Sequence, residues 1–579
     1  MAKYKLKKAG TSFELTQNEF VAQGGEGSIY ILGDRVYKVC LPGKMIPEQK
    51  FDELNALDHP KIIKPDDIIL ERNKPVGYTM PAVPNKPMPL VQLLTKSFRQ
   101  RENVTPDHMA NLVRQKSEII RHIHSHKGYL EVDGNECNAM VTSDFKELYA
   151  IDVNSYQTPS FPADAIMASI RDWHVAKDAN GTYIWTQASD WYSFAILSWY
   201  MFTGIHPFKG VHPNFPNAKT RMADQMLACK SVLDPEVLFP KGAVYFPFED
   251  VIPGGAGGAY MQWYRAILVD NKRMPAPKDF QAALAFIAKV KAIVGSNNFD
   301  IRELRNTFDM IVGHYDKNGK EVIVTKNSLF FNSMKLNRPA DRFRIGFTKG
   351  GITYACWLEG NEVKLQNLET GQPIPCDIVG SNIMSCEGRV YVQSLGSIME
   401  LEFIEQNALI CTARQVAQIM PNATQLYQGV AIQDMFGNKM FSVFPETHHH
   451  RSVSIPELNG YRIVDAKYEG NVLMIVGLEG ETGKYARFVC RFAKDWSGHD
   501  IRIIDDITPS GLNFTVLPQK GLCLCITEDE TMEIFQTIKD SPHIRLYTDP
   551  AIDGEMKLCH SGDQARFARG DHLYSISIK

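Results

Sequence analysis

Apolar positions follow two different spacings along this chain, and the change comes close to Gly295. Before it, several stretches carry an apolar residue every three to four positions; over residues 111–126, for example, Leu112, Ile119 and Ile123 form one helical stripe. After it, short β-branched and aromatic runs alternate with Gly, Asn and Asp, which is typical of strands and turns. The pattern predicts a mixed α and β first half followed by an all-β second half.

The first half is expected to begin with strands and to continue with helices. Two β-branched and aromatic runs flank a glycine turn within residues 20–40, and further strands are predicted over 62–70 and 76–80. Between them, apolar residues share one face of a helix predicted over 47–58. The most apolar stretch, about fifteen residues from Trp191, is shorter than a membrane span and is predicted to form a buried helix.

The second half predicts repeated small sheets. Strand pairs recur about every 40–50 residues over 319–579, the spacing of propeller blades with four strands each. These roughly 260 residues would form five to seven blades, and a pair of β-sandwiches is the alternative. Pairing of the last strand, near 573–578, with a strand near 321–324 would leave no open sheet edge. Residues 295–318, with a short helical segment at 299–310, are expected to link the halves.

Length, charge and cysteine content limit which kinds of partner and which cellular compartment are expected. The chain has 579 residues, which is too long for one core, and its 44% hydrophobic and 22% charged residues are ordinary for a globular protein. A net charge of −3 gives no indication of a nucleic-acid or membrane surface. Eleven Cys without a CxxC pair indicate reduced thiols, and the basic N-terminus lacks the apolar core of a secretory signal. We therefore expect a cytoplasmic protein with no nucleic-acid and no membrane partner.

Three polar residues in the first half are spaced for one kind of chemistry. Asn138 follows Asp133 by five residues, and Asp152 lies fourteen residues further on. A hairpin formed by residues 137–141 and 148–153 would bring the three to one edge. There, one carboxylate can orient a hydroxyl for attack on a γ-phosphate, while Asn and the second Asp hold Mg²⁺. An Asp with an Asn five residues later is also common in surface loops. Other motifs in the chain are therefore needed to distinguish a catalytic loop from a surface loop.

A glycine turn near the N-terminus offers a phosphate-binding element. The sequence VAQGGEGSIY places Gly24, Gly25 and Gly27 ahead of Ile29, and Lys38 follows nine residues later at the end of the next predicted strand. Glycines allow backbone N–H groups to approach phosphates without a Cβ in the way. A lysine in a strand often does no more than face solvent from one side of the sheet. The glycine turn before Lys38 favours a phosphate-binding role for it instead.

Taken in order, these segments resemble the protein-kinase-like superfamily over about residues 20–294. The turn resembles G-x-G-x-x-G-x-V, the Asp133 segment resembles H-R-D-L-x-x-x-N, and Asp152 stands where D-F-G has its metal-binding Asp. EVDGNECN and IDVNSYQT are most similar to a divergent bacterial and phage group with G-D-V-N-x-x-N catalytic loops and I-D-x-D-S-F-Q metal loops.

The resemblance implies a multidomain chain with ATP and Mg²⁺ as cofactors. A bilobal α+β protein-kinase-like domain would occupy 1–294, with an N-lobe at about 12–83 and a C-lobe at about 84–294, and the all-β domain, expected to be a β-propeller, would follow at 319–579. The site residues that it implies are Asp133, Lys38 and Asn138 for catalysis, Asn138 and Asp152 for the metal, and Gly24, Gly25, Gly27, Ile29, Lys38, Glu53, Met80 and Ala82 for the nucleotide.

Further positions match supporting elements of that family. Asp190, ahead of the buried helix, would receive backbone N–H groups of the catalytic loop. Arg273, in NKRMPAPKDF, matches an arginine whose acidic partner stays unidentified, because the segment 154–189 contains no clear A-P-E. Glu53 is chosen as the carboxylate that positions the strand lysine, although a gapless alignment puts Lys50 at that point.

Departures from the family pattern bear on function. Ala22 replaces the first glycine of the turn, and Asn135 stands where a lysine usually contacts the γ-phosphate. Val132 replaces the Arg that grips a phosphorylated loop, so the segment 154–189 is expected to be held by packing. The resemblance still implies a protein kinase of the Ser/Thr type whose β domain recruits a protein substrate or partner. The alternative is a pseudokinase–propeller scaffold without phosphotransfer.

Overall fold

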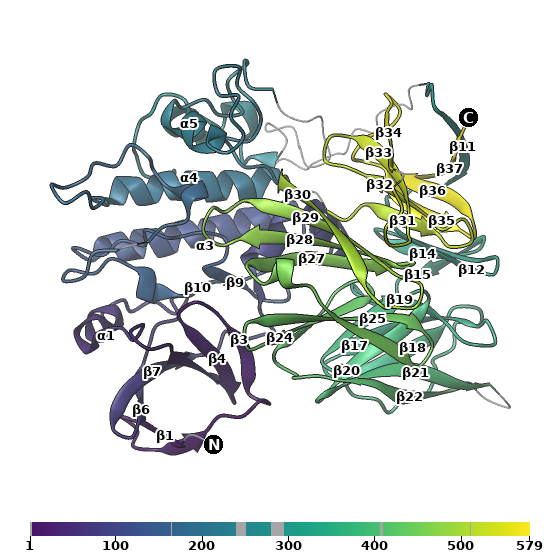
Figure 1. Cartoon of the computed structure of the whole chain (residues 1–579), viewed down its shortest axis with the longest axis horizontal. Helices are drawn as coiled ribbons and strands as arrows, with labels where there is room; N and C mark the ends of the chain where they lie inside the picture. The colour runs from purple at the N-terminus through teal and green to yellow at the C-terminus, as the bar shows by residue number, and fades with distance from the viewer. Residues whose placement is uncertain are drawn as a thin grey trace.

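The chain folds into a small N-terminal α+β part and a large C-terminal all-β region of many small sheets (Figure 1). The computed structural model describes residues 3–163, 165–238, 251–278, 295–405, 409–509, 511–542 and 544–579. In these ranges, every helix is too short or too polar to cross a membrane.

The N-terminal part begins with a seven-stranded antiparallel sheet of order β2-β1-β6-β7-β5-β4-β3. Its strands are β1 (Lys3–Leu6), β2 (Ser12–Glu14), β3 (Phe20–Gln23), β4 (Gly27–Leu32), β5 (Arg35–Cys40), β6 (Asp67–Glu71) and β7 (Lys74–Pro81). The helix predicted over 47–58 is confirmed as α1 (Glu48–Asn55), which buries Phe51 and Leu54. The glycine turn lies between β3 and β4, so the predicted hairpin is also confirmed.

Helices dominate the rest of this part. The elements are β8 (Met88–Pro89), η1 (Leu90–Leu94), α2 (Lys96–Arg101), α3 (Pro106–Ser125), β9 (Ala139–Val141), β10 (Leu148–Ala150), η2 (Val153–Ser155), η3 (Ala168–Ile170), α4 (Gln187–Thr203), α5 (Arg221–Leu227), η4 (Gly255–Gly257) and α7 (Ala259–Leu268). The side chain of Thr105 accepts a hydrogen bond from the backbone N of His108 and so caps α3. Helix α4 is buried along nearly its whole length, as its apolar sequence predicts, and it packs beside α3 (Figure 1).

The β region contains seven small antiparallel sheets within the described residues, and six of them use consecutive strands. These six are β12 (Ile311–Lys317), β13 (Lys320–Thr325), β14 (Ser328–Phe331) and β15 (Met334–Asn337); β16 (Arg344–Phe347), β17 (Thr353–Glu359) and β18 (Glu362–Asn367); β19 (Asn382–Cys386), β20 (Arg389–Ser394), β21 (Ser397–Glu405) and β22 (Leu409–Gln418); β23 (Thr424–Leu426), β24 (Val430–Met435), β25 (Asn438–Glu446) and β26 (His449–Ser454); β27 (Tyr461–Glu469), β28 (Val472–Glu479), β29 (Tyr485–Phe492) and β30 (His499–Ile507); and β31 (Phe514–Leu517), β32 (Leu522–Ile526), β33 (Thr531–Gln536) and β34 (Ile544–Thr548). A short helix, η5 (Pro456–Leu458), precedes β27.

The seventh sheet joins the two ends of the β region. Its order is β11-β37-β36-β35, formed by β11 (Phe299–Asn306), β35 (Lys557–Ser561), β36 (Gln564–Arg569) and β37 (His572–Ile578). The helical segment predicted at 299–310 is therefore wrong, because Phe299 and Ile301 alternate with charged residues and pack as a strand against the neighbouring sheet. The predicted closure partner at 321–324 is also wrong, since β13 already pairs with β12 and β14 on its two edges.

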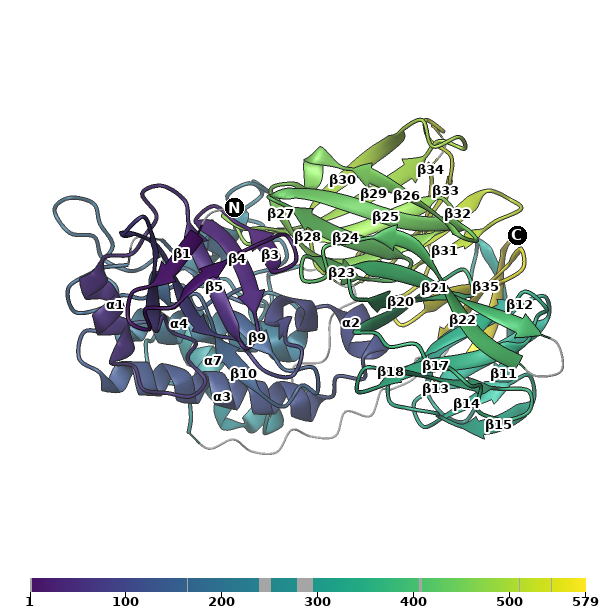
Figure 2. The ribbon, with the colours of Figure 1, turned by 90° about the horizontal axis from the view of Figure 1, so that it is seen from below.

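One apolar cluster runs through both parts of the chain. It joins residues of α3 and α4, such as Ile120 and Leu197, to residues of the β region such as Met474, Tyr485 and Phe514. Figure 2 shows the β region along one side of the N-terminal part, with α2 at the junction. The β region therefore contributes directly to the packing around the elements that carry the candidate site.

Candidate active site

The hairpin of β9 and β10 brings two of the predicted site residues together. Ala139 lies opposite Ala150 in this hairpin, and the backbone N of Ile151 donates to the backbone O of Asn138 over 3.0 Å. Asn138 and Asp152 therefore stand at the same end of the hairpin. This is the arrangement that the sequence predicts.

Asp133 faces Asn138 across the loop. Its Oδ2 accepts a hydrogen bond from Asn138 Nδ2 over 3.2 Å, and its Oδ1 accepts from Asn135 Nδ2 over 3.0 Å. A third donor is the backbone N of Met167, which lies 2.9 Å from Oδ1. Burial raises the pKa of Asp133 above its usual value even though these donors act to lower it. The carboxylate is therefore fixed in orientation by three donors.

Lys38 connects the strand, the glycine turn and the loop after β10. Its Nζ lies 2.6 Å from Oε2 of Glu26, 3.2 Å from Oδ1 of Asp152 and 3.4 Å from Oδ1 of Asn154. Burial acts to lower the pKa of Lys38, but Tyr78, Asp152 and Glu26 outweigh it and hold that pKa above its usual value. Lys38 is thus a permanent cation beside the candidate metal ligands.

The carboxylate that pairs with Lys38 was not found by sequence reasoning. Glu53, the predicted partner, instead accepts hydrogen bonds from the backbone N of Ser160 and from Gln49 Nε2, so that prediction is wrong. Glu26 takes its place because it lies in the turn directly before β4, which pairs with β5. The sequence signal for it is a single acidic residue, Glu26, between two glycines of the turn that was predicted to bind phosphate.

The three glycines of this turn differ in how much space surrounds them. A Cβ on Gly27 would lie 2.4 Å from the backbone O of Val39, so close strand pairing requires glycine there. A Cβ on Gly24 or Gly25 would meet nothing within 4 Å, which leaves open space around the tip. Ile29 pairs with Lys38 in the ladder of β4 and β5, as its spacing predicts.

The segment expected to contact adenine lies at the end of β7. Met80 is paired with Val36 in the ladder of β5 and β7, and it packs against the cluster that holds Tyr78. The backbone N of Ala82 donates to the backbone O of Asp34 over 2.9 Å. The N–H of Ala82 is thus already satisfied within the chain.

Asp190, at the start of α4, anchors the loop that carries Asp133. Its two carboxylate oxygens accept hydrogen bonds from the backbone N atoms of Glu131 and Val132, each over 2.9 Å. Oδ2 also lies 2.8 Å from Nε2 of His124. The predicted anchoring role of Asp190 is confirmed.

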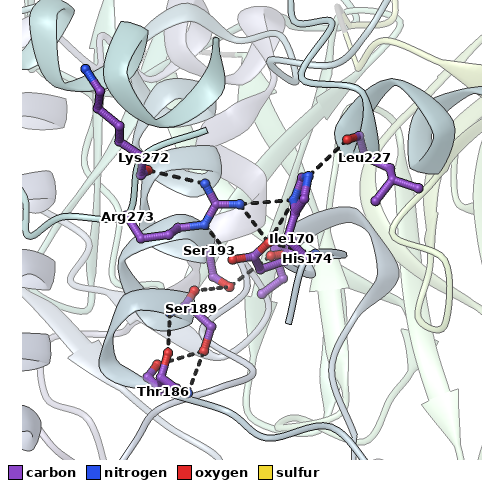
Figure 3. Close-up of polar contacts among 9 residues, drawn as sticks. Ile170, His174, Thr186, Ser189, Ser193, Leu227, Lys272 and Arg273 are labelled. Atoms are coloured by element: carbon purple, nitrogen blue, oxygen red, sulfur yellow. Dashed lines mark hydrogen bonds and ion pairs between the residues drawn. The ribbon is translucent and has the colours of Figure 1, made fainter. Parts of the chain in front are cut away.

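Arg273, which Figure 3 shows beside His174, has its acidic partner in Asp172. Its Nε and Nη2 lie 2.6 Å and 2.8 Å from the two carboxylate oxygens, a bidentate pair. Next to it, Ser193 Oγ of α4 donates to the backbone O of Ile170 over 2.9 Å. The sequence hid this partner because Asp172 stands in I-R-D rather than in A-P-E. The middle of the segment 154–189 is thus fixed to α4 and to the residues after α7.

Two other polar features of the described residues do not form a second reaction centre. His212, Asp234 and Glu236 lie close enough to bind one cation, but His212 Nδ1 accepts from the backbone N of Asn214, which places the ring proton on Nε2, the atom that would ligate. A cavity of about 580 Å³ lies among the first strands of the β sheets and α2. Charged residues in its wall are largely paired, as in Lys467 with Glu469 at 2.7 Å.

Comparison with known proteins adds little. No family model matches the chain, and no curated protein sequence matches it. Among solved structures, the protein kinase PK-1 of Cydia pomonella granulovirus is similar with a TM-score of 0.32 and 12% sequence identity, over 44% of this chain and 90% of that one. The similarity is weak, and the functional assignment rests on the site geometry.

Proposed function

We propose that the N-terminal part binds ATP with Mg²⁺ and transfers the γ-phosphate to a hydroxyl group of a protein. The observation that carries this proposal is the convergence of three segments: Lys38 lies 3.2 Å from Asp152, and Asn138 lies 3.2 Å from Asp133. A permanent cation, two oxygen ligands and a partly buried carboxylate are the groups that phosphoryl transfer requires.

The donor set fits a hard divalent cation. Asn138 uses its amide nitrogen to hold Asp133, which leaves the amide oxygen for a metal. The carboxylate of Asp152 is 42% exposed, so it can reach a ligand outside the protein. Mg²⁺, when bound there, would neutralise charge on the phosphate oxygens.

The protein's own groups would supply the remaining steps. Lys38 would pair with phosphate oxygens, and the open tip at Gly24 and Gly25 would cover them with backbone N–H groups. Asp133, held by Asn135, Asn138 and the N–H of Met167, would orient the acceptor hydroxyl and accept its proton.

The β region would be a closed seven-bladed propeller that binds a protein substrate or partner. In support, its sheets contain three or four antiparallel strands, six of them use consecutive strands, and in the seventh the pairing of β11 with β37 joins the first strand of the region to the last. A partner role for its loops follows from fold analogy alone.

A scaffold without phosphotransfer is the second candidate, and Asn135 favours it. Its Nδ2 donates to Asp133 and its Oδ1 accepts from the backbone N of Cys137 over 2.8 Å. Both ends of the side chain are thus engaged inside the loop, and neither is directed to a phosphate. A missing lysine contact would slow transfer.

Incubation of the purified protein with labelled ATP, Mg²⁺ and a general protein acceptor such as casein separates the two candidates. We expect incorporation of label by the wild type and by Asp52→Ala, which changes an exposed carboxylate of α1. Asp152→Ala should abolish incorporation while keeping the melting temperature, because this partly exposed side chain contributes little packing. Label transfer at the wild-type rate by Asp152→Ala would contradict the proposal, and ATP binding without transfer would favour the scaffold.

A further inference from the structure

We infer that the β28–β29 hairpin of the β region positions Asp133 for catalysis, acting through the backbone of Met167. The inference rests on the proposed phosphotransfer and makes the β region a working part of the catalytic unit. Gly483 and Tyr485, at the tip and at the start of β29, would be the positioning residues.

Met167 holds Asp133 through a backbone hydrogen bond. The backbone N of Met167 donates to Oδ1 of the carboxylate over 2.9 Å, and it is the one donor to Asp133, among the described residues, that comes from outside the loop 133–138. Met167 directly precedes η3 and is 7% exposed. Any shift of Met167 therefore changes how Asp133 is held.

The tip of the β28–β29 hairpin contacts the segment that contains Met167. The backbone N of Ala168 donates to the backbone O of Glu481 over 3.4 Å. A Cβ on Gly483 would lie 2.1 Å from Oγ and 2.7 Å from Cβ of Ser169, and 2.9 Å from the sulfur of Met167. The tip packs so closely on Met167 and Ser169 that a methyl group at position 483 would force these side chains to move, and the φ of 70° also favours glycine.

The same β sheet also holds the other side of the Asp133 loop. Tyr485 OH donates to Oε1 of Glu136 over 2.9 Å, and Arg462 Nη1 donates to the backbone O of Cys137 over 3.2 Å. Glu136 and Tyr485 are both buried. Hydrogen bonds from β27 and β29 thus fix the loop between Asp133 and Asn138 while the hairpin tip fixes Met167.

The opposite face of the segment is held by the N-terminal part itself. Ser193 Oγ bonds the backbone O of Ile170 (Figure 3), and His206 Nε2 lies 2.9 Å from the backbone O of Ser169. Val132 offers no charge that could hold a phosphorylated residue instead. Docking of the β region therefore takes the part that loop phosphorylation has in regulated kinases.

Gly483→Ala tests the inference, with Gly371→Ala as the matched control. Gly371 has a φ of 72°, almost the same as Gly483, but a Cβ there meets nothing within 4 Å. We expect Gly483→Ala to lower kcat about tenfold or more, because small displacements of a catalytic group are costly. The KM for ATP and the stabilisation by ATP against heat should stay at wild-type values in both variants. Tyr485→Phe, which removes the bond to Glu136, should lower kcat in the same way.

A second-site change supplies the decisive readout. Ser169→Gly removes both atoms of Ser169 that the new methyl group would meet, so Gly483→Ala with Ser169→Gly should recover most of the lost kcat. Wild-type kcat in both Gly483→Ala and Tyr485→Phe would overturn the inference. An equal loss of kcat in Gly371→Ala, or a failure of Ser169→Gly to restore kcat, would also overturn it.

The proposed function can fail separately. If the wild type neither binds nor uses ATP, the proposed function fails and the inference fails with it. If the wild type binds ATP and transfers phosphate but the variants behave like it, the inference alone is overturned.

Discussion

At the scale of single residues, Lys38 has two carboxylate partners on different elements. Glu26 comes from the glycine turn and lies 2.6 Å away, whereas Asp152 comes from the loop after β10 and lies 3.2 Å away. Asn154 Nδ2 also donates to Glu26 Oε2, over 3.0 Å. Glu26 therefore occupies, with its negative charge, the position beside Lys38 that a phosphate would take.

This arrangement predicts that Glu26 competes with ATP. Glu26→Gln should lower the KM for ATP several-fold, because the neutral amide releases Lys38 for the phosphates. The matched control is Glu53→Gln, which changes a carboxylate of α1 that bonds Ser160 and Gln49 instead. Steady-state kinetics at varied ATP concentration measures both. An unchanged KM for Glu26→Gln would contradict the competition, and a higher KM would mean that Glu26 supports nucleotide binding.

His206 predicts a dependence of stability on pH. Neutral His206 donates from Nε2 to the backbone O of Ser169 and accepts at Nδ1 from the backbone N of Phe208. Burial lowers its pKa to about 4. The native state thus binds the proton less readily than the unfolded chain, whose His has a pKa of about 6.5, so the stabilisation is complete above that pH and is lost as pH falls toward about 4.

The expected loss is up to about 3 kcal/mol across this window. Urea unfolding between neutral pH and about pH 5 should show a steeper fall for the wild type than for His206→Gln, which does not titrate. The nearest charges, Lys209 and Asp506, form a 2.7 Å pair with each other and remain in both proteins. Parallel pH curves for the two proteins would contradict the assignment to His206.

Single residues also show how far the sequence could predict the site. Asp133, Asn138 and Asp152 are local to one hairpin, so their spacing was enough to place them together. Glu26 and Met167 reach the site through turn geometry and through the backbone, which residue type does not encode. Closely spaced side chains and the backbone donors of Asp190 were therefore predictable, whereas the pairing of Glu26 and the backbone donor Met167 were not.

At the scale of elements, the segment 154–189 is held by packing, as its apolar residues predict. Ile166, Ile170 and Trp185 are buried, and Trp185 Nε1 donates to the backbone O of Ala163 over 3.3 Å. Trp173 is only half-buried and lies beside Arg171. Trp185 is thus the stronger of the two tryptophan anchors.

Trp185→Ala should destabilise the protein by about 3–5 kcal/mol, the usual cost of removing a buried tryptophan side chain. Trp173→Ala should cost less, and both should lower phosphotransfer more than Ser155→Ala, Thr158→Ala or Ser160→Ala. Chemical denaturation and the labelled-ATP assay measure the two effects, and phosphatase treatment should leave activity unchanged. A single Ser or Thr→Ala change that silences the enzyme while both tryptophan variants remain active would refute this account.

Elements also differ in how well their sequence predicted them. The stripe in α3 and the apolar run in α4 predicted helices because local spacing and burial agree. Residues 299–306 form β11 because the partner strand β37, whose paired residues lie 266 to 279 positions away, decides their conformation. Local pattern could not supply that pairing, since short amphipathic segments fit either period.

At the scale of the whole molecule, the two parts of the chain are joined by more than the connecting segment. Phe20 of β3 is fully buried, and its ring centroid lies 4.4 Å from that of Phe436 in the β region. Lys96 of α2 pairs with Glu555 at 2.5 Å, and Arg342 lies 3.1 Å from Glu102. The β region thus contacts the sheet and the helices of the N-terminal part at once.

A cut in the chain near Gly295–Asn298 should therefore leave the two pieces associated. Separation would expose the apolar cluster shared by α3, α4 and the sheet of β27–β30, at a cost of about 25 cal/mol for each Å² of apolar surface. With a specific protease site placed before Gly295, we expect both fragments to co-elute on gel filtration after cleavage and to separate only in denaturant.

Residues 1–294 expressed alone should aggregate or lose phosphotransfer, because the hairpin that holds Met167 is then absent. Elution of two separate, soluble fragments with full activity in the first would show that the N-terminal part is independent of the β region.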